Sequence, residues 1–225
     1  MLPLLAMTPA FLAADDPSDR RIAEQTALKP LGELVGAWRG VGMVQRNQQK
    51  GAWKETADWS WILSEGSAAL QLRLSDGKYL KSAVIRPGQA NGEFRLDAVL
   101  SNDAARSFIG KMNDRKQLVM ESEEKPNDTP ARLTITPLHE NRFLILLEAA
   151  EGPKNFRRLG EVGYTREGVA FAAGDGGPLC IVTGGRGTMA IKFRGETYYV
   201  CCSGCKQLFD ANPEAVIAQA KGRKP

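Results

Sequence analysis

Residues 53–61, WKETADWSW, alternate large or apolar side chains with polar ones at every second position. In an extended chain, Trp53, Glu55, Trp59 and Trp61 fall on one side, and the polar residues between them fall on the other. A period of two is typical of a strand with one buried face. We therefore expect the three tryptophans to lie in a core. Glu55 shares their side, and we expect it near a rim, where its carboxylate stays solvated.

Nine further segments have the same short, apolar or alternating character, and turn-forming sequences such as SDGK, PGQANG and EKPNDTP separate them. No helical pattern intervenes, so hairpin links join successive strands. Such a meander hides its edges by closing on itself. The sequence predicts a mainly β protein, with an antiparallel up-and-down barrel of about ten strands. The nine segments are residues 34–44, 67–74, 79–86, 92–100, 105–112, 116–122, 131–138, 142–149 and 156–165.

The first of these segments has a tryptophan, Trp38, between two glycines in the order GAWRG. This pattern resembles the opening strand of lipocalin-like and nitrobindin-like barrels. The resemblance implies a carrier function, in which the barrel holds a small apolar ligand or haem. Haem would need a histidine inside the barrel, and His139, the only histidine, falls between two predicted strands, where we expect a solvated loop side chain.

The composition divides the chain into five parts. Residues 1–14 are an apolar leader, residues 15–30 a polar helix or linker, residues 31–167 the barrel, residues 168–177 a Gly-rich linker, and residues 178–222 a cysteine-containing module. The leader resembles the apolar core of a signal peptide, followed by small residues suited to cleavage. We therefore expect a periplasmic or secreted protein, with a cytoplasmic location as the alternative.

The remaining composition excludes several classes of partner. The 30 basic and 26 acidic residues are interspersed, so the net charge of +4 builds no concentrated field for a phosphate backbone. We expect no nucleic-acid partner. No segment beyond the leader approaches the roughly 20 apolar residues of a membrane span, so we expect none.

All four cysteines lie in the C-terminal module, at Cys180, Cys201, Cys202 and Cys205. Twenty residues separate the first two, and they read as two short strands turning near residues 194–196, a hairpin that returns Cys201 towards Cys180. A helix is expected next, with Ser203 as its N-cap and Cys205 in its first turn, and a second helix from Asn212-Pro213. The positive end of a helix favours a thiolate.

This spacing suits a metal site. Three thiols in five residues cannot all pair comfortably, because a bond between the adjacent Cys201 and Cys202 departs from ordinary disulfide geometry. Two structural disulfides remain the alternative, since an exported protein meets oxidising conditions. If all four sulfurs coordinate, structural zinc is favoured; if three do, copper(I) or an open position is favoured. A site alternating between metal-bound and disulfide forms also stays open.

The cysteine pattern, with the hairpin sequence GETYY, Phe209 and Asn212-Pro213, resembles the YHS or TRASH-type metal-binding module. The resemblance covers roughly residues 178–220. It implies a small treble-clef-like site for zinc or copper(I), used in metal sensing, trafficking or storage. It also implies Cys180, Cys201 and Cys205 as ligands, with Cys202 as a further candidate.

No base, nucleophile and orienting group stand at a recognisable spacing, so we expect a non-enzymatic protein. The leading hypothesis is an exported protein that binds zinc or copper(I) through cysteine thiolates. The alternative is a carrier that holds a small apolar ligand or haem in the barrel and uses the cysteine module as a structural clip.

Overall fold

A computed structural model of the chain describes residues 16–45, 50–139, 141–167 and 177–222. The proposed leader, residues 1–14, lies outside the described residues, as do residues 168–176 of the proposed linker. The two predicted chain boundaries that depend on them stay predictions.

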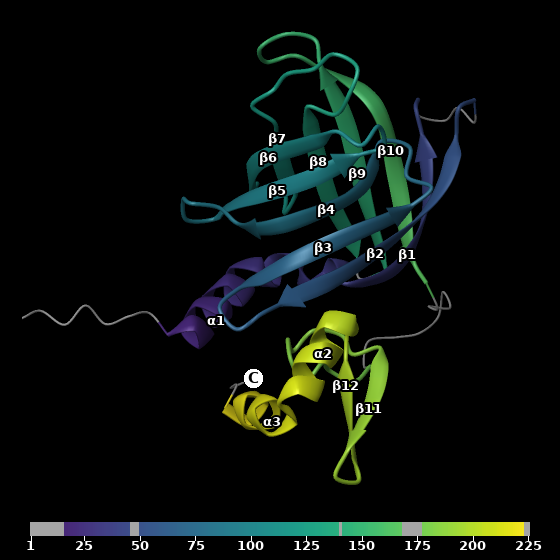
Figure 1. The fold of residues 1–225 in the computed structure, drawn as a ribbon. Helices are drawn as coiled ribbons and strands as arrows, with labels where there is room; N and C mark the ends of the chain where they lie inside the picture. Colours follow the sequence, from purple (N-terminus) through teal and green to yellow (C-terminus); the bar gives the residue numbers. More distant parts are fainter. Residues whose placement is uncertain (1–15, 46–49, 140, 168–176, 223–225) are drawn as a thin grey trace, which may run out of the picture.

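Ten antiparallel strands form a closed barrel (Figure 1). Each strand pairs with the next in the sequence, and β1 closes the barrel by pairing with β10, so that Trp38 lies opposite Ala57 on one side and Arg166 on the other. The predicted ten-stranded up-and-down barrel is confirmed. The strands are β1 Gly36–Met43, β2 Trp53–Leu63, β3 Ala68–Ser75, β4 Leu80–Pro87, β5 Glu93–Leu100, β6 Ala105–Met112, β7 Leu118–Glu121, β8 Arg132–His139, β9 Arg142–Ala150 and β10 Phe156–Arg166.

Strand β2 contains the alternating stretch from which the barrel was predicted. Trp59 and Trp61 are buried as expected, whereas Trp53, at the start of the strand, is only partly buried. The alternating polar residues Lys54, Thr56 and Asp58 are exposed. Ser60 breaks the alternation, because it belongs to the polar side and yet is buried. A second element therefore covers the outer face of the barrel at this end of β2.

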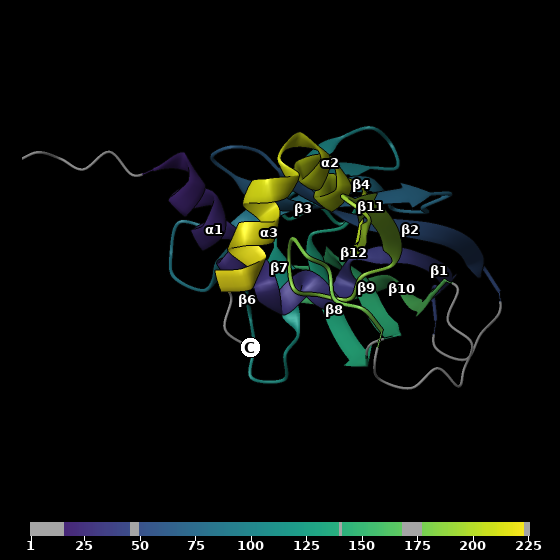
Figure 2. The same cartoon turned by 90° about the horizontal axis from the view of Figure 1, so that it is seen from below.

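A short helical segment lies across one end of the barrel (Figure 2). It consists of α1 Pro17–Leu28 and the 3-10 helix η1 Lys29–Leu34. Leu28, Leu31 and Leu34 are almost fully buried there. The helical path continues through Pro30, where the sequence suggested an end, because a proline in the first positions of a helix loses no hydrogen bond.

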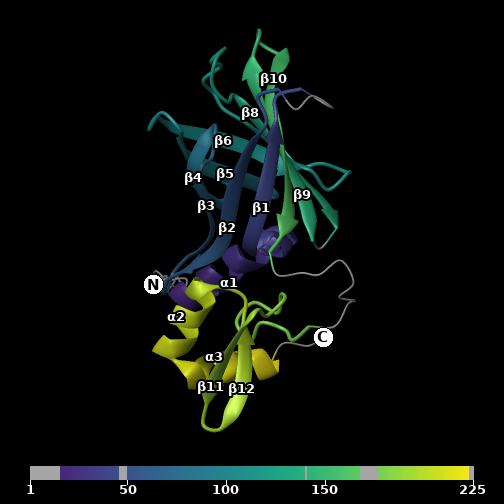
Figure 3. The same ribbon diagram turned by 90° about the vertical axis from the view of Figure 1, so that its right-hand side faces the viewer.

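The C-terminal module lies beyond the same end of the barrel (Figure 3). It contains a hairpin of β11 Met189–Phe193 and β12 Glu196–Val200, followed by α2 Ser203–Ala211 and α3 Pro213–Gly222. Helix α2 contacts the end of β2, which explains the burial of Ser60. Among the described residues, no helix is long and apolar enough to cross a membrane.

The start of α2 differs from the expectation by one residue. Ser203 was predicted as the N-cap, but Cys202 is the cap and Ser203 is the first helical residue. Cys202 has an extended backbone, and its side chain makes no capping bond. Its sulfur instead points to other partners, described below.

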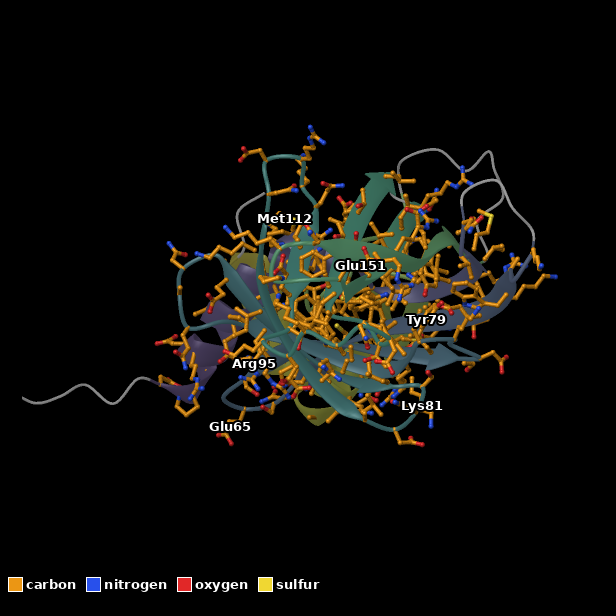
Figure 4. All side chains as sticks on the ribbon, turned by 90° about the horizontal axis from the view of Figure 1, so that it is seen from above. Glu65, Tyr79, Lys81, Arg95, Met112 and Glu151 are labelled. Carbon is orange, nitrogen blue, oxygen red and sulfur yellow. The ribbon has the colours of Figure 1, made fainter. Side chains whose placement is uncertain are left out.

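Ring side chains fill the interior of the barrel. Figure 4, seen from the end opposite to the cysteine module, shows side chains crowding the centre of the barrel while Glu65, Lys81 and Arg95 point outward. The largest fully buried rings of the barrel are Trp38, Trp59, Phe108, Phe143 and Tyr164. Trp38 packs edge-on against Phe143, and Phe143 stacks on Tyr164 at a centroid distance of 4.5 Å. The interior is thus a packed core.

Candidate metal centre

A tight loop at residues 178–187 places Cys180. The loop closes on itself, because the amide of Cys180 donates to the carbonyl of Gly185 at 2.6 Å and the amide of Gly184 donates back to Cys180 at 2.8 Å. Gly184 has a φ of 74°, a conformation that glycine adopts without strain. The loop therefore holds the Cys180 side chain on its inner side, where it is 1% exposed.

The hairpin brings Cys201 to this loop. Its turn at Arg194 and Gly195 has positive φ at both residues, 50° and 83°, as the tight turn of a two-residue hairpin requires. The loop is bound to β12, since the amide of Ile181 donates to the carbonyl of Tyr199 at 2.8 Å. Cys201 follows β12 directly, so this pairing sets the first two cysteines side by side.

Helix α2 supplies Cys205. This residue lies in the first turn of the helix and is fully buried together with Phe209, one turn further on. Phe209 packs against Phe193 and Tyr198 of the hairpin, at centroid distances of 6.0 and 5.6 Å. The aromatic contact fixes the helix against the hairpin and so directs the Cys205 sulfur toward Cys201.

Three sulfur atoms converge. The Sγ atoms of Cys180, Cys201 and Cys205 lie within 4.8 Å of one another, and those of Cys201 and Cys205 are 3.4 Å apart. Sulfurs bound to one zinc ion at about 2.3 Å are roughly 3.8 Å from each other in a tetrahedral site. All four cysteines are free thiols. A cluster of this size fits a single thiolate-bound ion.

The fourth cysteine has a different environment. The Cys202 Sγ lies 4.0 Å from that of Cys201, and it accepts a hydrogen bond at 3.3 Å from the backbone amide of Trp61, on the barrel. Its sulfur thus faces the end of β2. The structure brings Cys202 to the edge of the cluster, outside the trio that lies within 4.8 Å.

Hydrogen bonds among the thiols divide them into two pairs. Bonds from Cys201 and then Cys205 lower the pKa of both Cys180 and Cys202, so these two sulfurs favour the thiolate. The reciprocal bonds raise the pKa of Cys201 and Cys205, which hold their protons as donors. A cation that binds the sulfurs as thiolates must displace the protons that the cluster holds.

The negative charge of the cluster reaches the barrel. Burial, followed by the charge at Cys202, raises the pKa of Asp58 on β2, and Arg73 opposes both. An anionic cluster is stabilised when a cation neutralises it, and thiolates prefer zinc and copper(I) over hard cations such as Mg²⁺. The residues present therefore fit a borderline or soft metal ion.

The docking of α2 on β2 is a contact that the sequence did not predict. A Cβ atom at Gly204 would overlap the carbonyl oxygen of Trp61, so only a glycine permits this approach of helix to strand. Trp61 consequently belongs to the surroundings of the metal centre as well as to the barrel. A glycine inside a predicted first helical turn was the signal available, because glycine disfavours helix interiors unless another backbone comes close.

A second buried polar group also differs from expectation. Glu55 was predicted to be solvated near a rim, but it is 6% exposed. Its carboxylate accepts hydrogen bonds from the Tyr164 hydroxyl and, at 2.6 Å, from the Trp53 indole. Burial, and then the Glu55 charge, raise the pKa of Tyr164 well above its ordinary value. These donors compensate the buried carboxylate, which explains why the rim prediction was wrong.

Comparison with known proteins shows neither a family nor a function for the chain. No family model matches the chain, and no curated protein matches it. The chain is similar to Rv2717c from M. tuberculosis, known from a crystal structure, with 14% sequence identity and a TM-score of 0.41, over 63% of this chain and 97% of that one. What the protein does is therefore inferred from its own residues.

Proposed function

We propose that the protein binds one zinc or copper(I) ion through thiolates of its C-terminal module, with Cys180, Cys201 and Cys205 as ligands. The observation that supports this most directly is the buried trio of sulfurs within 4.8 Å. The trio joins a loop, a strand end and a helix. Three independent elements converge on one point, as a structural or transport metal site requires.

Cys202 decides the geometry of the site. If its sulfur leaves the Trp61 amide and joins the other three, the site is a closed tetrahedron that favours zinc. If it stays on the amide, three sulfurs bind the ion in a trigonal arrangement that favours copper(I), or leave one position open. The 3.3 Å bond between Trp61 and Cys202 supports the second arrangement in the metal-free thiol cluster.

The biological role that we propose is metal sensing, trafficking or storage by a non-enzymatic protein. The resemblance of residues 178–220 to YHS and TRASH-type modules supports it, as do four buried thiols without a histidine among them. The apolar leader supports a periplasmic or secreted location, with the cytoplasm as the alternative. An exported protein would need the metal to keep such closely spaced thiols from oxidising.

The alternative carrier function has less support. A carrier barrel needs an internal cavity, commonly some 300–1,000 Å³ for a small molecule. The described interior instead contains five nearly inaccessible aromatic rings, and three of them, Trp38, Phe143 and Tyr164, pack against one another in sequence. Haem would need a histidine inside the barrel, and His139, the one histidine in the sequence, is the last residue of β8, at the end of that strand. The packed core therefore favours the metal site as the functional centre.

The test is elemental analysis of protein purified without oxygen, combined with a count of free thiols before and after chelation. We expect about one zinc or copper ion per chain and thiols that become reactive once the ion is removed. Cys205→Ser removes a ligand from the centre of the trio and should abolish stoichiometric binding. Ser203→Ala, at an exposed neighbouring position, is the matched control and should keep the ion.

Two outcomes would contradict the proposal. Protein that holds no metal and shows free thiols only after a disulfide reductant is added would mean that disulfides clip the module. Metal that survives in Cys205→Ser at full stoichiometry would place the site elsewhere. Binding must also weaken as the pH falls, because protons compete with the ion for thiolates.

A further inference from the structure

A cleft lies between the end of the barrel and the cysteine module. It has a volume of about 830 Å³, and both parts contribute to it: α1 and η1 on one side, and the loop at residues 177–186 on the other. This volume lies within the range of small-molecule sites, roughly 300–1,000 Å³. The barrel and the module together can thus enclose a ligand that neither part could hold alone.

The cleft reaches the metal centre at one ligand. Cys201 lines it, together with Trp61 and Thr183, and the Thr183 hydroxyl lies 3.7 Å from the Cys201 sulfur. Cys180 and Cys205 are more deeply buried, at 1% and 0% exposure against 6% for Cys201. A molecule in the cleft therefore approaches the ion along Cys201.

The lining combines positive charge with apolar surface. Lys29, Arg166 and Arg186 contribute cations, and Glu33 contributes the one carboxylate among the described lining residues. The Arg166 guanidinium is held in place, because it donates to the carbonyls of Val35 at 2.8 Å and Glu33 at 2.6 Å and stacks on Trp38. The apolar part of the lining consists of Ile22, Val35, Trp61, Leu179 and Val182. Such a surface suits an anion with a short carbon skeleton.

The arrangement of Cys202 leaves room for an external ligand. Its sulfur is bound to the Trp61 amide, so three protein sulfurs face the ion, and a fourth donor can come from the cleft. A soft or borderline ion held by thiolates prefers another sulfur as that donor. A molecule with both a thiol and carboxylates would satisfy the ion and the cationic lining together.

We infer that the cleft binds a small, carboxylate-bearing thiol, whose thiolate becomes the fourth ligand of the metal ion. The inference rests on the proposed metal site. On binding, the sulfur forms one bond to the ion and its proton passes to the solvent, with no change in oxidation state. The cleft would then serve as the place where the ion is received from, or handed to, a small thiol carrier.

The experiment uses the full chain loaded with Co²⁺ under anaerobic conditions, and glutathione is the probe. Cobalt bound by thiolates has a charge-transfer absorption that grows with each added sulfur ligand. We expect a saturable increase at one glutathione per chain. S-methylglutathione keeps the charges and lacks the thiolate, so it should compete with glutathione without causing the increase.

Variants connect the signal to the cleft. A Cβ at Gly32, in the lining, would have nothing within 4 Å, so Gly32→Trp places an indole in the open space and should suppress the glutathione signal at least tenfold. Gly152→Trp, at a position equally free of neighbours but on the barrel, is the matched control and should respond as the wild type. Lys29→Glu should weaken glutathione binding roughly two- to fivefold, since an exposed ion pair contributes little.

The outcomes separate the two proposals. Cobalt uptake and copper(I) uptake are recorded before the thiol is added, so a chain that binds neither ion refutes the metal site itself. Normal uptake with no glutathione response leaves the metal site standing and overturns the cleft inference. A response that is the same in wild type, Gly32→Trp and Lys29→Glu also overturns it, because glutathione would then be acting outside the cleft.

Discussion

The barrel and the cysteine module are stabilised in different ways. The barrel closes ten strands around a continuous apolar core, and successive strands supply that core at every second residue. The module has two short strands and two short helices, and sulfur occupies much of its interior. Its buried apolar residues besides the cysteines are Val182, Ile191, Val200, Phe209 and Val216.

This difference shows why the thiols are concentrated in one place. A unit of fewer than about 70 residues buries too little apolar surface to be stable alone and commonly needs a metal or disulfides. The module, residues 177–222, is of that size. It has two supports, the sulfur cluster at its centre and the contact of α2 with β2.

The largest expected effect is the removal of the metal ion that we propose for the module. Apparent binding energies of structural zinc sites are about 10–16 kcal/mol at neutral pH, more than the module's apolar core can replace. Chelation under reducing conditions should therefore unfold residues 177–222 and leave the barrel folded. Amide hydrogen exchange, measured with and without the chelator, should show the loss of protection in β11, β12, α2 and α3, and no loss in the barrel strands.

The control for chelation is re-addition of the ion, which should restore protection if no thiol has been oxidised. Equal loss of protection in the barrel strands would contradict separate stabilisation of barrel and module, because the two parts would then unfold as one cooperative unit.

Next in size is a deletion in the barrel core. Phe108 is fully buried and Ile109, the next residue on β6, is 39% exposed on the opposite face. Phe108→Ala should cost about 3–5 kcal/mol of unfolding free energy, because it leaves a cavity in the barrel core. Ile109→Ala should cost below about 1 kcal/mol.

Urea unfolding measures the stability of both variants, and elemental analysis measures their metal content. Stability should fall in Phe108→Ala while the metal stays near the wild-type amount. A loss of metal in proportion to the loss of stability would mean that the barrel core holds the site together.

A smaller effect is expected where the two parts meet. Alanine in a helix is normally about 1 kcal/mol better than glycine. At Gly204 the sign should reverse, because a Cβ there would overlap the Trp61 carbonyl and push α2 off β2. We expect Gly204→Ala to destabilise the module by about 1–3 kcal/mol and to speed exchange of the Trp61 amide. Gly222→Ala, where a Cβ would meet nothing within 4 Å, is the matched control. A neutral Gly204→Ala would show that the contact adds nothing.

Local patterns allowed the barrel and the cysteine cluster to be predicted. The period of two in residues 53–61 depends only on the side chains of that strand, and the spacing of Cys180, Cys201 and Cys205 depends only on one hairpin and one helical turn. The contact of Gly204 with Trp61 joins residues more than 140 positions apart, so no local pattern in the sequence predicts it. The burial of Ser60 and the bond from Trp61 to Cys202 follow from that contact.

Glu55 was mispredicted for a related reason. The general rule places a carboxylate in solvent, and it fails only when donors from distant strands converge. Here one donor, Tyr164, lies on β10, which becomes a neighbour of this part of the barrel only through closure at β1. The barrel could be predicted from the strands, but its internal polar contacts depend on closure and register.

The smallest expected effect is a dependence of barrel stability on alkaline pH. Tyr164 has a raised pKa in the folded chain, chiefly because it is buried and secondly because Glu55 is near. In the unfolded chain a tyrosine loses its proton near pH 10. Above that pH the unfolded state binds fewer protons than the folded state, so stability falls by up to about 1.4 kcal/mol per pH unit.

Tyr164→Phe removes this proton while keeping the stack on Phe143. At neutral pH the variant should be less stable by about 1–3 kcal/mol, because the buried Glu55 carboxylate loses a donor. From about pH 10 upward that deficit should shrink, since only the wild type still has Tyr164 to titrate. Urea unfolding of both proteins between pH 8 and pH 11 measures this difference in stability. Parallel curves would show that folding does not raise the pKa of the Tyr164 hydroxyl. Convergence of the two stability curves would show that the two regions respond to pH in opposite directions. The barrel loses stability in alkali, whereas the proposed metal site loses its ion in acid, where protons displace it.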